Sequence, residues 1–216
     1  MFDGFGPGAV AWFEGLERDN SRAYFQAQRP VFERHVHGPF EALLDDLSVE
    51  FGGEPKVFRQ HRDIRFSPDK SPYKTRTYGI LHDGSGTAWY AAVSASGLYA
   101  ATGYWRMAGD QLERYRAAAS DELAALLDAV RAAGLEISPP ALKTAPRGFP
   151  RDHPHAALLR YKDVIAGRNL PPGPVLESRE ALEFVAATWR KAAPLNAWLA
   201  EHVGATATER RRGGGA

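Results

Sequence analysis

The sequence predicts a single α+β domain over residues 1–203, with an antiparallel meander sheet of about five strands and helices packed mainly over one face. Two observations carry this prediction. Near both ends of the chain, apolar residues recur at the spacings typical of amphipathic helices. Between these regions, short segments rich in β-forming residues are separated by turn residues, as in strands joined by hairpins.

The first quarter of the chain is expected to be helical. A short helix over residues 10–17 is followed by Asp19 or Asn20, either of which can cap a second helix. The second helix carries an apolar stripe at spacings of three, four and seven, which predicts one face turned toward the core. The stripe consists of Phe25, Phe32, Val36, Phe40, Leu43, Leu44 and Leu47.

The middle of the chain is expected to form most of the sheet. Residue types and turn signals predict extended segments over residues 59–66, 73–81, 89–94, 98–105 and 161–170. A proline-marked type I turn is predicted over residues 67–70, and residues 83–86 are a strong hairpin signal. Tyr99, Ala101 and Gly103 share one strand face, where small residues leave room for a ligand or for a closely packed helix. The helix is the favoured interpretation.

Helices are predicted again in the later part of the chain. Two of them, over residues 110–118 and 120–133, begin at residues suited to helix capping. A proline-rich loop is expected over residues 135–150, and a last amphipathic helix over residues 178–199. From residue 204 to residue 216 the low sequence complexity predicts a disordered tail.

The composition excludes several classes of protein. An apolar content of 44% and a charged content of 25% are ordinary for a soluble globular protein. The absence of cysteine excludes disulfides, thiolate zinc sites and a cysteine nucleophile, and it fits a reducing compartment. Neither a signal peptide nor a membrane helix is indicated, so a cytoplasmic location is expected.

The densest cluster of charged residues lies between Arg59 and Tyr73. Four permanent bases, two carboxylates and one phenol occur within these fifteen residues. From Arg59 to Arg76, six bases stand against two acids, a local charge of +4 in a chain whose net charge is +1. Because a guanidinium can bind a carboxylate or phosphate through two parallel hydrogen bonds, this cluster predicts a site for a small anion.

The same residues carry a family resemblance. The pattern R-x-x-R-D-x-R-F-x-x-x-D-K-x-x-Y is met by Arg59, Arg62, Asp63, Arg65, Phe66, Asp69, Lys70 and Tyr73. It resembles the hallmark of a bacterial family catalogued as domain of unknown function 2461. Further family-like residues are Trp12, Phe13, Leu16, Asn20, Arg22, Phe25, Pro146, Arg147, Gly148, His153, Pro154, Leu159, Arg160 and Lys162. The resemblance spans roughly residues 5–203 and implies no activity, substrate or cofactor, because the family has none assigned.

The candidate site residues follow from the cluster and from the later family-like segment. The candidates for binding the anion are Arg59, Arg62, Asp63, Arg65, Asp69, Lys70, Tyr73, Lys74, Arg147 and Lys162. The candidates for moving a proton, if a reaction takes place, are Asp63, Tyr73 and His153. No metal and no cofactor are expected, since the sequence contains none of the usual motifs for them.

Two other interpretations of the cluster stay open. The first is a salt-bridge network with a purely structural role, because removing one partner of a buried pair typically costs about 3 to 5 kcal/mol. The second is a non-catalytic module that binds a protein or single-stranded nucleic acid. Nucleic acid is not the expected partner, since a nearly neutral chain lacks a broad basic stripe. Aromatic residues of the meander can stack on bases, but core packing is the favoured role for them.

Overall fold

The computed structural model describes residues 1–82, 84–150 and 152–207. Its centre is a six-stranded sheet in the order β1-β2-β3-β4-β6-β5, in which all neighbouring strands are antiparallel. The strands are β1 (Glu54–Val57), β2 (Arg76–His82), β3 (Ala88–Ser94), β4 (Gly97–Tyr104), β5 (Glu136–Ile137) and β6 (Val164–Leu170). The predicted α+β class and antiparallel sheet are therefore confirmed, while the sheet has six strands instead of five.

The strand count differs from the prediction at two places. β5 is a two-residue strand inside the stretch expected to be a loop, and Pro139 and Pro140, which lack an N–H group, follow it closely. The predicted strand over residues 59–66 is not a strand of the sheet. The chain pairs earlier, at β1, whose mostly exposed residues and proline gave no alternating signal.

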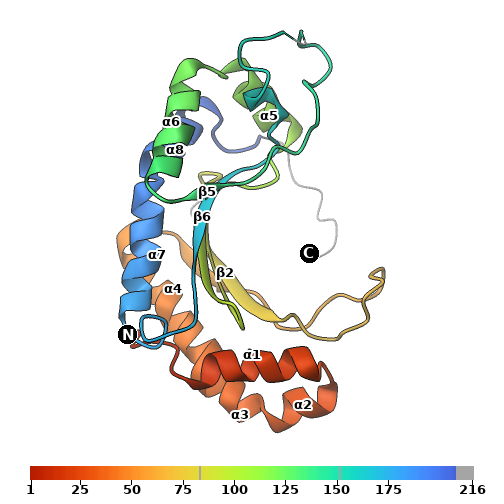
Figure 1. The fold of residues 1–216 in the computed structure, drawn as a ribbon, viewed down its shortest axis with the longest axis vertical. Helices are drawn as coiled ribbons and strands as arrows, with labels where there is room; N and C mark the ends of the chain where they lie inside the picture. Colours follow the sequence, from red (N-terminus) through yellow and green to blue (C-terminus); the bar gives the residue numbers. More distant parts are fainter. Residues whose placement is uncertain (83, 151, 208–216) are drawn as a thin grey trace.

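The helices pack beside this sheet (Figure 1). They are α1 (Gly8–Arg18), α2 (Arg22–Ala27), α3 (Arg29–Phe32), the π-helical turn η1 (Glu33–His37), α4 (Gly38–Phe51), α5 (Gly109–Ala117), α6 (Asp121–Ala132), the 3₁₀ turn η2 (Leu158–Arg160), α7 (Glu180–Lys191) and α8 (Ala193–His202). The predicted cap is wrong, because Ser21 accepts the hydrogen bond from the Tyr24 N–H and opens α2.

One face of the sheet is covered by helices. Gly79 of β2 lies against Leu44 of α4, and Thr102 of β4 accepts a hydrogen bond from Asn196 of α8 at 2.9 Å. Figure 1 shows α4 and α7 on this same side. The predicted one-sided packing is thus confirmed.

Tyr99 lies on the face of the sheet opposite the helix-covered one. The register places Tyr99 next to Ala92 of β3, and both alternate with the helix-covered positions. In the described part of the chain, the helices that make the main contacts with the sheet do not lie on the Tyr99 face. The expected helix against the Tyr99 face is therefore wrong.

Two hydrophobic clusters fill the helix side. The first joins α1 to α4 and α7 with β3 and β4, and includes the fully buried Phe13, Phe40 and Trp189. The second joins α5, α6 and α8 with the start of β6, around Tyr104 and Tyr115. Among the described residues, no helix combines the length and the hydropathy needed to cross a bilayer.

The predicted tail begins inside the folded part. Gln111 of α5 donates to the Gly204 carbonyl at 2.8 Å, and Asp110 accepts from the Thr206 hydroxyl at 2.7 Å. These bonds place residues 204–207 against α5. The remainder of the predicted tail, residues 208–216, lies outside the described residues.

Candidate functional site

The charged cluster forms an arm, residues 58–75, that leaves the sheet between β1 and β2 and projects away from it (Figure 1). Its two halves pair through backbone hydrogen bonds from Lys74 N–H to the Gln60 carbonyl and from Arg62 N–H to the Pro72 carbonyl, both at 2.9 Å. His61 and Tyr73 form a β-bridge between them. Because Pro72 has no N–H group, the ladder ends there. The arm is therefore a short hairpin extension instead of a full strand pair.

The base of the arm is fixed to the helices by Tyr73. Its side chain is only 2% exposed, and its ring stacks on Phe25 of α2 with 4.2 Å between ring centroids. The side chain of Asn20 bonds both backbone polar groups of Tyr73 at 3.0 Å. The phenol predicted as a proton-moving group therefore has a clear packing role.

The tip of the arm is held by two ion pairs. Arg65 donates to both carboxylate oxygens of Asp63, at 2.9 and 2.6 Å, and these bonds lower the pKa of Asp63 from 3.8 to about 2. Arg62 pairs with Asp69, and this hydrogen bond, together with those from Ser71, holds the pKa of Asp69 far below its usual range. Both carboxylates are ionised at neutral pH and are weak bases.

The tip turn differs from the predicted type I turn over residues 67–70. The Ser67 N–H bonds the Ile64 carbonyl at 3.4 Å, and the Lys70 ammonium donates to the same carbonyl at 3.0 Å. Phe66 is 95% exposed, so the apolar side chains of the arm do not all find a partner. Hydrogen bonds to the Ile64 carbonyl therefore stabilise the turn, in place of the type I geometry predicted around Pro68.

The positive charge of the arm is only partly compensated. Within the described residues, neither Arg59, Lys70, Lys74 nor Arg76 has a carboxylate within ion-pair distance. Lys74 donates instead to the Arg59 carbonyl and the Tyr78 hydroxyl, both at 2.9 Å. The local excess of four positive charges therefore stays available to an external anion.

A pocket of about 370 Å³ lies between the arm and α2. We call it the arm pocket. Its lining consists of Arg22, Gln26, His61, Arg62, Ile64, Pro72 and Tyr73. This lining includes two arginines and no acidic residue. Among the described residues, the Arg22 side chain has no ion-pair or hydrogen-bond partner.

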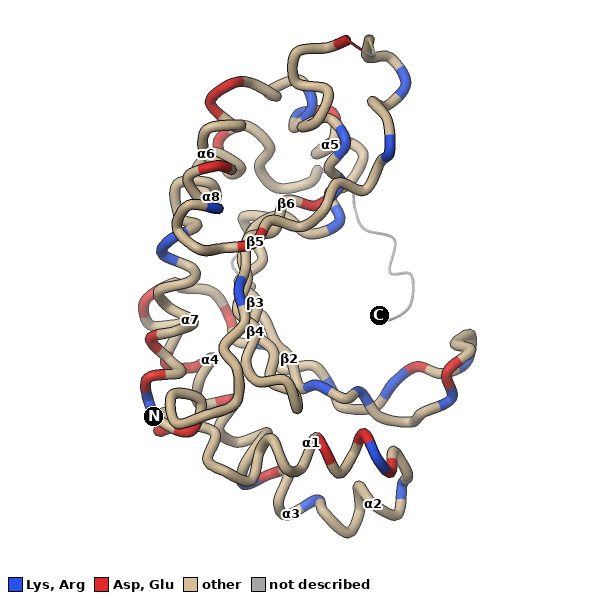
Figure 2. The backbone as a smooth tube through the Cα atoms, in the orientation of Figure 1, with Lys and Arg blue, Asp and Glu red and all other residues tan. Residues whose placement is uncertain are grey.

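The later candidate residues lie elsewhere. Lys162 precedes Val164, which pairs with Tyr104, whereas the arm leaves the sheet beside Arg76, which pairs with Ser94 at the opposite end. Figure 2 shows the basic residues of the later segment and those of the arm well apart. Arg147 and His153 belong to that later segment, and the His153 ring accepts a hydrogen bond from the His155 N–H at 3.0 Å. The structure does not bring Arg147, His153 or Lys162 to the arm.

Arg22 and Gln26 of the arm pocket were not predicted as binding residues. The family resemblance named Arg22, which was the available signal for it. Gln26 follows Arg22 by four residues, so both lie on the same face of α2. Their contribution depends on α2 packing beside the arm, which local sequence patterns do not encode.

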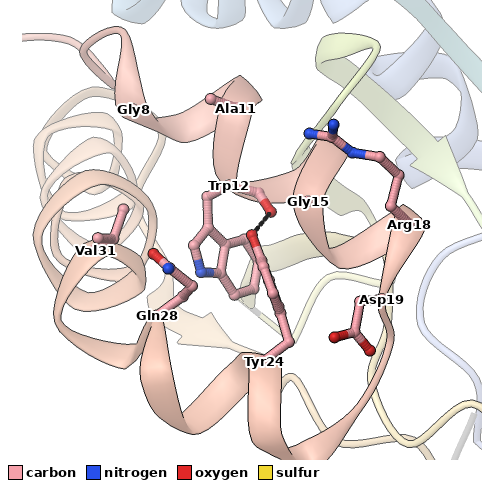
Figure 3. A pocket seen from close by; sticks show the side chains of 9 residues that line it. All are labelled: Gly8, Ala11, Trp12, Gly15, Arg18, Asp19, Tyr24, Gln28 and Val31. Carbon is pink, nitrogen blue, oxygen red and sulfur yellow. Dashed lines mark hydrogen bonds between the residues drawn. The ribbon is translucent and has the colours of Figure 1, made fainter.

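A second pocket, of about 430 Å³, lies among α1, α2 and α3 (Figure 3). Figure 3 shows Tyr24 reaching across it, and its hydroxyl donates to the Trp12 carbonyl at 3.1 Å. Burial raises the pKa of Tyr24. This pocket contains no residue of the arm, so it is separate from the candidate site. In the part of the chain that is described, no three histidine, aspartate or glutamate side chains gather as metal ligands would.

Comparison with known proteins agrees with the resemblance. A family model described as "Conserved hypothetical protein (DUF2461)" matches residues 8–198. No curated protein matches the chain.

Proposed function

The chain belongs to the family described as conserved hypothetical protein, domain of unknown function 2461, which assigns it no activity, and from this premise we propose that it binds a small anion. The ligand carries a phosphate or carboxylate group that enters the arm pocket. The observation that carries the proposal is the convergence of Arg22 and Arg62, from distant parts of the chain, on one pocket without an acidic residue. The lack of cysteine fits binding in a reducing cytoplasm.

The two arginines supply complementary contacts. Arg22 has no partner among the described residues, so its guanidinium can offer two parallel N–H donors to one anion. Arg62 uses one Nη for Asp69 and makes a long contact of 3.5 Å from the other to the Ser67 hydroxyl. Since a guanidinium carries five N–H donors, Arg62 retains donors for a ligand. Gln26 and His61 add polar atoms at the same pocket.

The ion pairs of the tip favour a second role for the motif. Asp63 with Arg65 and Asp69 with Arg62 fix the shape of the arm, as a structural network does. This role and anion binding are separable, because Arg22 takes no part in either pair. A variant of Arg22 therefore tests binding without loosening the tip.

The test is thermal unfolding in the presence of phosphate, sugar phosphates and carboxylates at matched ionic strength. A ligand at a hundred times its dissociation constant adds about 2.7 kcal/mol, which raises the midpoint by roughly 5 to 10 °C for a chain of this size. We expect this rise in the wild type and in the control Arg34→Ala, an exposed arginine on η1. We expect its loss in Arg22→Ala.

Two results would contradict the proposal. One is a flat response of the wild type to every anion tested. The other is an equal rise in the wild type and in Arg22→Ala, which would place the bound anion outside the arm pocket. A flat response combined with a lowered midpoint in Arg62→Ala would assign the motif to structure alone.

A further inference from the structure

A row of aromatic rings lies on the sheet face that lacks the main helix contacts among the described residues, which we call the uncovered face. Phe58, Tyr78, Tyr90 and Tyr99 come from the start of the arm and from β2, β3 and β4. Their ring centroids are separated in turn by 4.9, 5.9 and 6.1 Å. All four side chains are half-buried, so each keeps some surface exposed to solvent. The row crosses the strands on the face opposite the helices.

Positive charges gather at one end of this row. The Lys56 ammonium lies 5.3 Å from the centre of the Phe58 ring, and the Lys74 ammonium lies 4.5 Å from the centre of the Tyr78 ring. The Arg76 guanidinium lies 5.6 Å from the same Tyr78 ring. Among the described residues, none of these three bases has a carboxylate within ion-pair distance. The face therefore combines aromatic surface with uncompensated positive charge.

Tyr99 occupies the other end of the row and lies over a glycine. A Cβ atom at Gly167 of β6 would come within 2.6 Å of the Tyr99 hydroxyl. The phenol therefore extends over the neighbouring strand, and a side chain at position 167 would displace it. Tyr99 is half-buried, so part of its surface stays exposed for stacking.

From these observations we propose that the uncovered sheet face binds a nucleoside monophosphate. The base stacks on the Tyr99 ring, while the Tyr90 ring, inclined by 63° to it, flanks the base, and Lys74 and Arg76 hold the phosphate. Base–aromatic stacking requires no particular base, and lysine or arginine at the edge of the rings supplies the charge that a phosphate needs. The site lies on the side of the arm away from Arg22, so it does not depend on the arm pocket.

The distribution of charge favours a single nucleotide over a long strand. Among the described residues, the basic side chains that lie over the row are at its Phe58 and Tyr78 end. At the other end, Glu136 of β5 pairs with Gly167, beneath Tyr99. A polynucleotide would carry a second phosphate toward this glutamate, where the two negative charges repel. Burial raises the pKa of Tyr90 to about 12. Its neutral hydroxyl does not repel an anion.

The experiment is calorimetric titration of the full chain with adenosine, cytidine, guanosine and uridine 5′-monophosphates. Adenosine, ribose 5-phosphate and inorganic phosphate serve as partial ligands. We expect a nucleotide to bind, with affinity about tenfold weaker in Tyr99→Leu, which removes the stacking ring. We expect a comparable loss in Lys74→Gln, and weaker binding of each partial ligand than of the nucleotide.

Matched controls exist at the opposite end of the sheet. The Arg106 guanidinium lies 4.5 Å from the exposed Trp105 ring, a similar cation–aromatic pair away from the row. Trp105→Leu and the exposed Lys143→Gln are expected to leave nucleotide affinity unchanged. In an Arg22→Ala background, where the arm pocket is disabled, Tyr99→Leu is expected to cause the same loss of nucleotide affinity, which separates this site from the arm pocket. Circular dichroism verifies that each variant is folded.

Several outcomes would overturn this inference. Inorganic phosphate binding as tightly as the nucleotide, and lost in Arg22→Ala, would assign all anion binding to the arm pocket. An affinity for single-stranded oligonucleotides that grows with length would indicate a polymer site instead. The absence of binding for all four nucleotides, or equal losses in the control variants, would also refute the proposal.

Discussion

The side-chain amide of Asn20 bonds both backbone polar groups of Tyr73, donating to its carbonyl and accepting from its N–H, each at 3.0 Å. The amide thus acts as a neighbouring strand would at the base of the arm. We expect Asn20→Ala to lower the free energy of unfolding by about 1 to 3 kcal/mol, because both Tyr73 groups lose their partner. Chemical denaturation measures this value. The exposed Asp19→Ala is the control, and an equal loss there would contradict the role of Asn20.

Asn20 also shows where sequence patterns stop being sufficient. The sequence predicted Asp19 or Asn20 as the cap of the second helix, because both side chains suit that position. Ser21 takes that role, and Asn20 is used for a contact with a residue distant in sequence. The choice depends on where the arm lies relative to α2, and local spacing carries no information about that.

In the sheet and in the site, too, local sequence signals predicted some features, and contacts between distant residues determine the others. The hairpin signal after β2 and the alternation of β3 and β4 are local, and they predicted the meander correctly. The two-residue strand β5 has no local signal, because its pairing depends on β6. Likewise, the charged cluster indicated Arg62 and the family resemblance indicated Arg22. Their shared pocket, however, depends on how α2 packs beside the arm.

The tip of the arm is expected to respond to acid. Arg65 lowers the pKa of Asp63 from 3.8 to about 2, so the pair stabilises the folded arm above about pH 4. This contribution is lost as the pH falls from about 4 through 2, when the carboxylate takes up a proton in the folded state. NMR titration of the Asp63 carboxyl carbon is expected to give a midpoint near 2. In Arg65→Ala the midpoint is expected to return toward 3.8.

The ion pair of Asp69 is expected to protect the arm from proteases. Asp69 bonds Arg62 and the Ser71 N–H, so Asp69→Ala releases both. Local opening then exposes the backbone near Lys70 without global unfolding. We expect trypsin to cleave this variant after Lys70 faster than the wild type, with little change in the thermal midpoint. Asp128→Ala, which breaks the exposed Arg131 pair on α6, is the control. Equal cleavage of Asp69→Ala and wild type would contradict the prediction.

Gly15 is expected to be intolerant of even a methyl group. A Cβ atom there would overlap the hydroxyl of Tyr24, whose side chain spans the pocket of Figure 3. Alanine favours a helix over glycine by about 1 kcal/mol, but overpacking costs typically about 1 to 3 kcal/mol. We therefore expect Gly15→Ala to be destabilising in chemical denaturation. The double variant Gly15→Ala with Tyr24→Leu should lose less free energy of unfolding than the two single variants together. Simple additivity would show that the two residues do not meet.

Gln60 is expected to be the main polar support at the base of the arm. Its buried side chain, 6% exposed, donates to the carbonyls of Lys74 and Arg76 and accepts from the Thr77 hydroxyl at 2.9 Å. We expect Gln60→Leu to cost about 2 kcal/mol, because one buried hydroxyl and two partly buried carbonyl groups lose this partner at once. For a chain of this size the thermal midpoint falls by roughly 2 to 4 °C for each kcal/mol.

A double-mutant cycle with Thr77→Val separates this hydrogen bond from packing. Thr77→Val removes the hydroxyl that Gln60→Leu leaves without a partner, so the double variant should cost less than the two single variants together. If the double variant costs as much as the two single variants together, Gln60 and Thr77 are not coupled. In that case Gln60 would support the arm through the two carbonyls alone, and Thr77→Val by itself would be expected to leave the stability nearly unchanged.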